Sequence, residues 1–449
     1  MTSVLDSILL QNNFSTPAIR SIWSDDNKIS KQLAVEAALA KIEGDLGIIP
    51  KSAADKIVEK AKVDNFDFLS LQKESAEKRH SLIALIHALQ EEVGGKEGEF
   101  VHYCVTTQDI VDTGIMLQTK EAYNIILDHT KDLISTLAKL TKEHRSTLMI
   151  GRTHGIHAIP ITFGFKLSIW LDELLRSQRR LKQLLENDVF VGSISGAVGS
   201  YASFFGRGRE VEKAVLKELG LAVPNISWQP SRDRFSEFAS VLGIFSGTLG
   251  KIGRELFTLM KTEIDEVHEP FKKGEVGSST MPQKRNPALI EGLASLTQPV
   301  FKDVDLMFQS LLIDGERDAI HWRNEWVALP EITSYLDAQI VNATYILSGL
   351  KVNKDKMLDN LNKQGALPYS ERIMFEVGLK LGKQTAHEIV YQAAMTALEE
   401  NKDFIDLVYS DERVRLNFTK EDILSWVDPK NNIGECLEKV DEVLSQVTI

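Results

Sequence analysis

The stretch from Gly277 to Pro287 reads GSSTMPQKRNP and interrupts a sequence whose neighbouring segments have helical character. Its first half is small and rich in backbone amides, whereas Pro282 and Pro287 restrict the backbone of its second half. Lys284 and Asn286 supply hydrogen-bond donors between the prolines. We interpret the stretch as a movable lid that binds an oxyanion. The small residues at its start are Gly277, Ser278 and Ser279.

The segments around this loop indicate long helices. No proline occurs between Pro50 and Pro160, and stretches rich in Leu, Ala, Glu, Lys and Gln favour helix. We therefore predict an almost entirely α-helical fold, with three clear helices at Phe165–Asn187, Glu237–Val267 and Leu289–Leu312. The first has leucines at alternating spacings of four and three, which is typical of a bundle seam: Leu167, Leu171, Leu174, Leu181 and Leu185.

The predicted helix Glu237–Val267 carries four glycines at spacings of three and four, namely Gly243, Gly247, Gly250 and Gly253. Each glycine inside a helix costs roughly 1 kcal/mol. Such a row is best explained by a second helix that approaches closely along this face.

A helix of thirty residues spans roughly 45 Å, which is too long for one small domain to cover. The long helices therefore predict an elongated bundle that buries its seams against other subunits. We expect an N-terminal helical domain at 1–111, a central long-helix bundle at 112–350 that contains the loop 274–288, and a C-terminal helical domain at 351–449.

Composition excludes several classes of function. The chain has 449 residues and a formal net charge of -12, which disfavours general attraction to nucleic acid or to anionic membranes. No uncharged apolar run is long enough to span a bilayer, and the N-terminus lacks the pattern of a signal peptide. Cys104 and Cys436 form no CxxC motif and are expected to be free thiols. We expect a cytoplasmic protein.

Three further polar segments interrupt the helical pattern. The first, at 101–114, reads VHYCVTTQDIVDTG and places Thr106 and Thr107 just before a helical pattern. Hydroxyls and free amides at a helix start suit a carboxylate or phosphate, although an ordinary N-cap without a ligand is the alternative.

The second segment, GRTHGIHAIPITFG at 151–164, contains His154 and His157. A helical pair at this spacing could bind zinc, but no third ligand lies nearby at a suitable spacing. A structural histidine and a general acid at a helix start are the other two interpretations.

The third segment, WQPSRDRFSEF at 228–238, sets Gln229, Arg232 and Arg234 at the entrance to the glycine-bearing helix. The arginines are either solvated surface residues or part of a binding site.

The signature loop resembles that of the fumarase/aspartase superfamily, written GSSxMPxKxNP, and the other three segments resemble superfamily regions in the same order. The resemblance implies a homotetramer with a twenty-helix core, five helices from each subunit. It also implies active sites built from three subunits, which cleave a C–N or C–O bond beta to a carboxylate and usually release fumarate. It implies a small dicarboxylate as substrate and neither a metal nor an organic cofactor.

The resemblance also implies roles for individual residues. Ser278 corresponds to the catalytic base, and His154 to the acid that protonates the leaving group. Thr106 and Thr107 resemble carboxylate clamps. A proton beside a carboxylate is very weakly acidic, so the dianion left by its removal needs donors such as those of Lys284 and Asn286. The remaining residues that we assign to substrate binding are His80, His102, Gln229, Arg232 and Arg317.

Two branches of the superfamily fit. Adenylosuccinate lyases resemble the chain at RHS (79–81), although they usually have Asp where this chain has Ser81. Carboxymuconate cycloisomerases resemble it at SRDRFSEFAS (231–240) and at ERDAIHWRNEWVALPE (316–331), where Trp322 and Trp326 replace residues that hold a nucleotide phosphate.

We therefore expect an adenylosuccinate-lyase-like C–N lyase that acts on a succinyl-type substrate. The alternatives are a lactonising enzyme like 3-carboxy-cis,cis-muconate cycloisomerase and an epimerase or lyase of another amino- or imino-dicarboxylate. A non-catalytic structural relative is a further alternative, which the joint presence of Ser278, Lys284, Asn286 and His154 disfavours.

Overall fold

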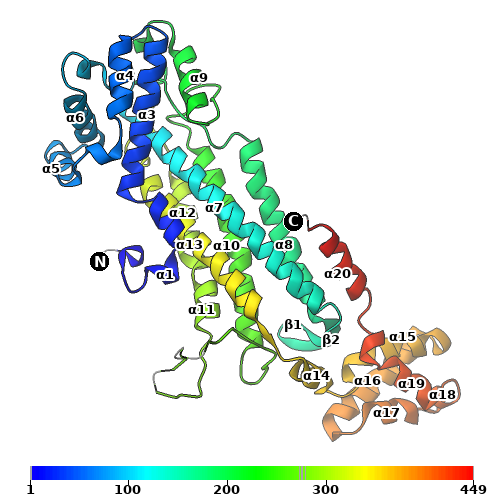
Figure 1. The fold of residues 1–449 in the computed structure, drawn as a ribbon. Coiled ribbons are helices and arrows are strands. Elements are labelled where there is room, and N and C mark those ends of the chain that lie inside the picture. Colours follow the sequence, from blue (N-terminus) through cyan, green and yellow to red (C-terminus); the bar gives the residue numbers. More distant parts are fainter. Residues whose placement is uncertain (1–2, 273, 275–276, 279, 448–449) are drawn as a thin grey trace. The chain divides into compact units, whose positions relative to one another are not determined.

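The computed structural model describes residues 3–272, 274, 277–278 and 280–447 (Figure 1). The described chain is mostly helical, which confirms that part of the predicted fold class. Its longest helix, α7, contains 37 residues, and its four short strands form two two-stranded ladders. The twenty-helix tetramer core stays a prediction.

The helices run as follows: α1 (Gln11–Phe14), α2 (Pro17–Ile22), α3 (Asp25–Asp45), α4 (Lys51–Lys60), α5 (Phe68–Lys78), α6 (Ser81–Val93), α7 (Thr107–Glu143), α8 (Phe163–Glu186), α9 (Gly208–Glu218), α10 (Asp233–Leu259), α11 (Ala288–Ser295), α12 (Thr297–Gln309), α13 (Asn324–Gly349), α14 (Lys354–Asn362), α15 (Ser370–Leu381), α16 (Lys383–Glu400), α17 (Phe404–Ser410), α18 (Glu412–Arg415), α19 (Lys420–Trp426) and α20 (Cys436–Ser445). The strands are β1 (Leu148–Thr153), β2 (Ile156–Thr162), β3 (Val267–His268) and β4 (Lys351–Val352).

The chain divides into two compact units, each assembled from separated segments. Unit 1 contains residues 1–130, 176–250 and 295–341, and unit 2 contains residues 131–175, 251–294 and 342–449. The predicted division at 111 and 350 into three consecutive domains stays a prediction.

Within unit 1, α4 and α9 both pack against α3 (Figure 1). Helix α3 begins after Ser24, whose side chain accepts a hydrogen bond from the amide of Asn27 and so caps the first turn. Gly44 permits the contact with α4, because a Cβ at that position would overlap Ala54. Helix α3 carries Glu36 and Glu43, whose side chains are both buried.

The glycine row on α10 does face closely packed helices, as predicted. A Cβ at Gly243 would lie 2.8 Å from Val304, and one at Gly247 would lie 3.3 Å from Phe301 on α12. In unit 2, a Cβ at Gly253 would lie 2.9 Å from the backbone of α11. The first three glycines make room for side chains of α12 and Gly253 makes room for the backbone of α11, which explains why the helix carries four glycines.

Two predicted helices have different bounds in the structure. Helix α10 ends at Leu259, and Val267 lies in β3, which pairs with β4. The segment Leu289–Leu312 forms two helices, α11 and α12, that meet at Leu296. The end of α10 has no glycine or proline at its boundary, whereas Pro299 in the first turn of α12 is a local signal for the break at Leu296 that the prediction did not use.

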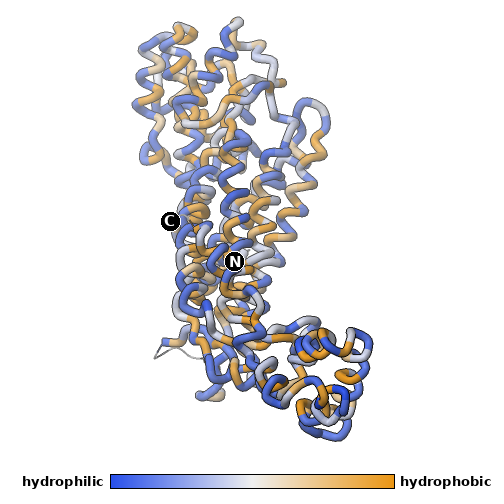
Figure 2. The backbone as a smooth tube through the Cα atoms, turned by 90° about the vertical axis from the view of Figure 1, so that its right-hand side faces the viewer, coloured by the Kyte–Doolittle hydropathy of each residue, from blue (hydrophilic) through white to orange (hydrophobic). Residues whose placement is uncertain are grey.

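The leucine stripe of α8 is largely buried, since Leu167, Leu171, Leu174 and Leu181 are all fully covered. Leu185 is 46% exposed, so the seam ends before the last predicted position. Figure 2 shows the matching alternation of hydrophobic and hydrophilic residues along the helices.

Unit 2 contains the one strand pairing that bears on the predicted site. β1 and β2 form an antiparallel hairpin, and β2 contains three isoleucines and Thr162. The expectation that this segment starts a helix was wrong, because α8 begins only at Phe163. Helices α15 to α19 surround a separate apolar core, whose fully buried members include Ile373, Val377, Val408, Val414 and Ile423.

None of the helices in the described part of the chain is both long and apolar enough to cross a membrane.

Candidate active site

In unit 1, the predicted carboxylate clamp lies at the N-terminus of α7. Thr107 is the first residue of the helix, and Thr106 directly precedes it. The guanidinium of Arg317 donates a hydrogen bond to the hydroxyl of Thr106 across 2.9 Å. The structure therefore brings together two predicted binding residues that are far apart in the sequence. A hydroxyl, a guanidinium and the amides of a helix start form a suitable surface for a carboxylate.

His80 lies beside the second threonine of the clamp. Its Nδ1 accepts a hydrogen bond from the amide of Ile83 at 3.2 Å and thereby caps α6. A neutral imidazole that accepts at Nδ1 carries its proton on Nε2, which lies 3.4 Å from the hydroxyl of Thr107. His80 is therefore oriented so that it can donate to Thr107 or to a ligand beside it.

His102 pairs with a buried carboxylate. Its Nδ1 lies 2.6 Å from an oxygen of Glu36, which is 1% exposed. Burial opposes the charged imidazolium, but the attraction and hydrogen bond of Glu36 outweigh it and raise the pKa of His102. His102 also has a left-handed backbone with φ of 61°, a conformation that non-glycine residues seldom adopt outside constrained sites.

Asp109 is the organising residue that the sequence analysis missed. Its buried carboxylate accepts hydrogen bonds from the amides of Thr106 (3.0 Å), Ser195 (3.0 Å) and Gly196 (2.9 Å). The side-chain amide of Gln229 donates to it across 3.3 Å. Asp109 thus joins the clamp to the loop at 193–196 and to a predicted binding residue. The spacing of Thr106 and Asp109 matches the T-x-x-D variant of a capping box, a signal that could have identified it.

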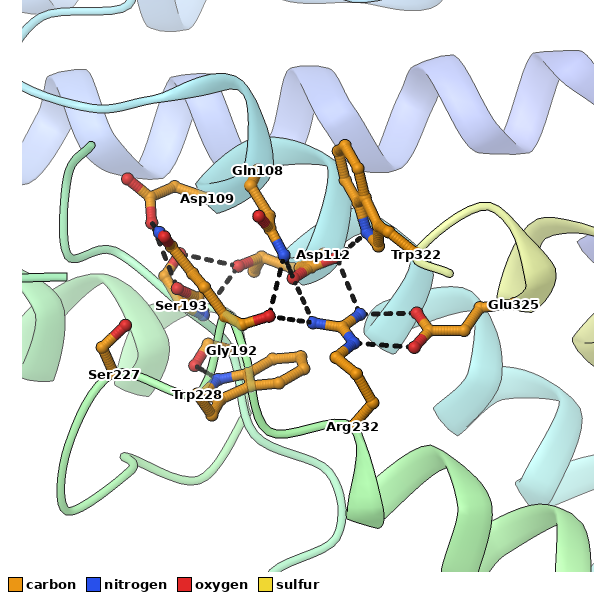
Figure 3. Close-up of polar contacts among 12 residues, drawn as sticks. Gln108, Asp109, Asp112, Gly192, Ser193, Ser227, Trp228, Arg232, Trp322 and Glu325 are labelled. Carbon is orange, nitrogen blue, oxygen red and sulfur yellow. Dashed lines mark hydrogen bonds and ion pairs between the residues drawn. The ribbon is translucent and has the colours of Figure 1, made fainter. Parts of the chain in front are cut away.

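Arg232 lies in a buried ionic cluster with Asp112 and Glu325 (Figure 3). Its side chain donates to both oxygens of Asp112 (2.7 and 3.1 Å) and of Glu325 (2.7 and 2.5 Å). A fifth, longer bond of 3.5 Å reaches the carbonyl oxygen of Gln229. Burial disfavours the charged guanidinium, but the two carboxylates outweigh it and raise the pKa of Arg232.

The interpretation of Arg232 as a solvated surface arginine was wrong, because its side chain is fully buried. All five of its N–H donors have acceptors within the cluster, so direct substrate binding by Arg232 does not fit this geometry. Trp322 is part of the same cluster and donates from its indole to Asp112 across 2.7 Å. Trp326 packs edge-on against Trp322 with ring centroids 5.0 Å apart.

In unit 2, the signature loop arranges backbone amides around Ser278. Its Oγ accepts hydrogen bonds from the amides of Thr280 (3.3 Å) and Met281 (3.0 Å). Gly277 is required here because a Cβ would lie 2.5 Å from the carbonyl oxygen of Lys284. Ser279, which we also assigned to the amide-rich half, lies outside the described residues.

The cationic half of the loop lines a hollow of about 750 Å³. Lys284 and Asn286 are exposed there, together with Arg285 and Lys261. Glu269 fixes the end of the loop, because its carboxylate accepts a hydrogen bond from the amide of Ile290 in the first turn of α11 at 3.1 Å. Unit 2 therefore holds a concentration of donors that suits an anion.

His154 lies at the turn of the β1–β2 hairpin, with φ of 54°. Its placement at a helix start was therefore wrong, whereas its predicted catalytic role stays a prediction. The neighbouring strand is anchored by Arg152, whose guanidinium forms a bidentate pair with buried Glu266 (3.0 and 2.6 Å). Burial first, and then the charge of Arg152, lowers the pKa of His157. Within the described residues, no group of three or more His, Cys, Asp or Glu side chains is arranged to hold a metal.

The predicted site residues therefore fall into two sets. Unit 1 holds His80, His102, Thr106, Thr107, Gln229, Arg232 and Arg317, and unit 2 holds His154, Ser278, Lys284 and Asn286.

Comparison with known proteins gives this arrangement its family. The family model described as Lyase matches residues 10–301, and the one described as Adenylosuccinate lyase C-terminus matches residues 366–443. The chain belongs to the fumarase/aspartase superfamily. It is a lyase from the branch of adenylosuccinate lyases and carboxymuconate cycloisomerases, as the signature loop predicted.

Individual relatives of this lyase carry different names. It is 54% identical over 442 residues to N-acetyl-S-(2-succino)cysteine lyase of Enterococcus italicus, covering 98% of this chain and 97% of that protein. It is 38% identical to adenylosuccinate lyase of Methanocaldococcus jannaschii, covering 96% of this chain and 94% of that protein. The structure of 3-carboxy-cis,cis-muconate lactonizing enzyme from Pseudomonas putida has a TM-score of 0.91 at 31% identity, covering 98% and 99% of the two chains.

Proposed function

We propose that this lyase cleaves the carbon–sulfur bond of an S-(2-succino) thioether, such as N-acetyl-S-(2-succino)cysteine, and releases fumarate and a thiol. The observation that carries the proposal is the 54% identity, over nearly the full length of both chains, to a protein named for that substrate. The succinyl half retains the dicarboxylate that the sequence predicts, whereas the leaving atom is sulfur in place of the predicted nitrogen.

The proposed reaction is a β-elimination. A base removes a proton from the methylene carbon of the succinyl group, and the electrons delocalise into the adjacent carboxylate. The carbon–sulfur bond then breaks, and the electron pair leaves on sulfur while the double bond of fumarate forms. The dianionic intermediate needs donors aimed at the carboxylate, a role we assign to Lys284 and Asn286.

Ser278 is the proposed base. A serine hydroxyl is a poor base unless its alkoxide is stabilised. The two amide hydrogen bonds that reach Ser278 Oγ, from Thr280 and Met281, support this role because they stabilise negative charge on that oxygen.

The clamp of Thr106, Thr107 and Arg317 is proposed to hold the other succinyl carboxylate. The bond between Arg317 and Thr106 supports this assignment, because it places a cation beside the N-terminus of α7. His80 borders the same place, and Gln229 connects to it through Asp109, whereas His102 pairs with Glu36.

The basicity of the leaving group decides how strongly the rate of elimination depends on a general acid. A free cysteine thiol has a pKa of about 8.5, so a thiolate departs far more readily than an amide-like or amine nitrogen. We propose that His154 supplies a proton to poor leaving groups and contributes less when sulfur leaves.

Cleavage of adenylosuccinate is the second candidate function. The 38% identity to a protein of that name and the match of the C-terminal family model favour it. Against it, Trp322 and Trp326 occupy the segment where nucleotide-binding relatives are expected to hold phosphate.

One assay distinguishes the candidates. The purified chain is incubated with N-acetyl-S-(2-succino)cysteine, adenylosuccinate, carboxymuconate and argininosuccinate, and fumarate, lactone and free thiol are measured separately. The proposal requires equal amounts of fumarate and thiol from the thioether, with a higher kcat/KM than for any other compound. Turnover of adenylosuccinate alone would replace it with the second candidate.

We also propose that the enzyme is a homotetramer whose subunits contact one another through helices such as α10 and α12. On unit 1, Ile244, Phe301 and Phe308 line a hollow of about 510 Å³ and are each roughly half exposed. A second copy of the chain is the proposed occupant, because long-helix bundles bury such seams between subunits. Multi-angle light scattering should give four times the 50.3 kDa chain mass.

A further inference from the structure

A cavity of about 150 Å³ in unit 1 lies beside the clamp. Residues from α3, α7 and α13 surround it, together with the first residue of α6 and the residue after α2. Its principal lining side chains are Trp23, Lys28, Gln32, Ser81, Val111 and Trp326. None of the roles assigned above uses this space.

Two lining residues connect the cavity to the clamp. Ser81 directly follows His80, whose Nε2 lies 3.4 Å from the hydroxyl of Thr107. Val111 is four residues after Thr107 on α7, so the two side chains lie on the same helical face. A substrate whose carboxylate lies at the clamp can therefore extend its other end into this cavity.

The aromatic walls of the cavity are fixed by hydrogen bonds and packing. The indole of Trp23 donates to Thr333 across 2.8 Å. Trp326 packs against Trp322, which in turn donates to buried Asp112. Rigid indole faces suit a short apolar group such as a methylene or an acyl methyl.

The charge of the cavity limits its ligand. A neighbouring hollow shares Lys28, Gln32 and Ser81 with this cavity. Among the described residues that line the two spaces, Lys28 is the one cation. Asp25 also lines both spaces and would repel a second anionic group. One ammonium suits one carboxylate, whereas nucleotide phosphates usually engage several donors. The cavity volume of about 150 Å³ is half the volume of roughly 300 Å³ that the smallest pockets for drug-sized ligands have, so the cavity suits a small group.

We propose that this cavity binds the leaving thiol as a small N-acylated amino acid whose carboxylate pairs with Lys28. The proposal rests on the proposed function and names the half of the substrate that determines specificity. The acyl group lies against the indoles of Trp23 and Trp326, and the sulfur points toward the clamp.

Two thioethers that differ only in this carboxylate provide the test. One is N-acetyl-S-(2-succino)cysteine, and the other is the S-(2-succino) derivative of N-acetylcysteamine, which lacks the carboxylate. Lys28→Gln should raise KM about tenfold for the first compound and leave KM for the second unchanged, because a charge-assisted hydrogen bond is lost only there. Lys28→Arg should restore most of the affinity. Lys41→Gln removes a charge from the same helix at a surface pair with Glu218 and is the matched control.

An equal change in KM for both compounds, or no change for either, would overturn the proposal. If the wild-type enzyme converts neither thioether, the proposed function fails while the cavity stays testable. Calorimetric titration with N-acetylcysteine should then show binding to the wild-type chain that weakens about tenfold in Lys28→Gln. Binding that is absent in the wild type, or identical in the two proteins, would reject the cavity as a site for the leaving group.

Discussion

Arg317 donates a hydrogen bond to the hydroxyl of Thr106 across 2.9 Å, and this contact joins the loop before α13 to the residue before α7. The pair combines a cation with a helix N-terminus, which is the arrangement a carboxylate requires. Both residues were assigned to substrate binding from sequence, but their contact could be recognised only in the folded chain.

The first prediction concerns this pair. Arg317→Gln should raise KM for the succinyl substrate by about ten- to a hundredfold, because a charge-assisted contact to the carboxylate is lost. Steady-state kinetics measures the change, and Arg323→Gln in the same loop is the control for charge. Unchanged KM in Arg317→Gln would remove Arg317 from the binding site.

The second prediction concerns the base. Ser278→Ala should lower kcat by about 10²- to 10⁴-fold, the usual contribution of a positioned acid or base. Its fold should be unchanged because Ser278 lies in a loop outside the apolar cores. Circular dichroism and light scattering test the fold and assembly of the variant. Turnover within threefold of wild type, which is roughly 0.65 kcal/mol of barrier, would show that another group removes the proton.

The third prediction concerns the proton donor. His154→Asn should slow elimination more as the leaving thiol becomes more basic, because a poorer leaving group depends more on protonation. A series of S-(2-succino) thiols with different pKa values measures this dependence, with His157→Asn as the matched control. The same slowing across the whole series would argue against His154 as the acid.

The fourth prediction concerns the buried ionic cluster. Arg232→Met should reduce the free energy of unfolding by about 3–5 kcal/mol, because Asp112 and Glu325 would be left as uncompensated buried charges. Urea denaturation measures the loss. Arg234→Met, two residues later, should change stability by only about 0.5 kcal/mol. An equal loss of unfolding free energy in the two variants would mean that the ion pairs of Arg232 with Asp112 and Glu325 do not stabilise unit 1.

The fifth prediction concerns pH. Burial, followed by repulsion from Glu36, raises the pKa of Glu43 from 4.5 to about 8. Both carboxyl oxygens of Glu43 are buried, and the nearby thiol of Cys104 offsets only part of the increase in pKa. Because the pKa of Glu43 is higher in the folded state than in the unfolded state, the folded state is favoured while Glu43 is protonated. This contribution to the free energy of unfolding is fully present below pH 4.5 and is lost as pH rises through about 8.

The measurement for Glu43 is a series of thermal denaturation experiments at pH 5, 7 and 9. Wild type should lose stability over this range, and Glu43→Gln should lose less and be the more stable protein at pH 9. Glu59→Gln on the surface of α4 serves as the control. Parallel pH profiles for wild type and Glu43→Gln would show that Glu43 does not account for the loss.

The helical nature of the chain could be predicted because it depends on local patterns. The leucine stripe of α8 and the glycine row of α10 are periodic, and the structure confirms both. The β1–β2 hairpin was missed because its residues do not alternate regularly and because Gly151, Gly155 and Pro160 are typical of turns and loops. The break between α11 and α12 at Leu296 was also missed, although Pro299 in the first turn of α12 is a local signal for it.

The candidate site could be predicted only where a short motif carries it. Ser278, Lys284 and Asn286 belong to one contiguous motif, so their chemistry is visible in the sequence. Asp112 was not assigned, because its partner Arg232 is distant in the sequence, and the local capping pattern that marks Asp109 does not reveal its bonds to Ser195 and Gly196.

The sequence by itself determined the superfamily, the helical class and the chemistry of the signature loop, because periodicity and motif spacing are local properties of the chain. Only the tertiary structure decided that Arg232 is a buried structural cation, that His154 lies at a hairpin turn and that Lys28 lines a cavity beside the clamp. The reason is physical. Whether a charged side chain meets water, a carboxylate or a ligand depends on segments that are distant in the sequence and become neighbours only when the chain folds.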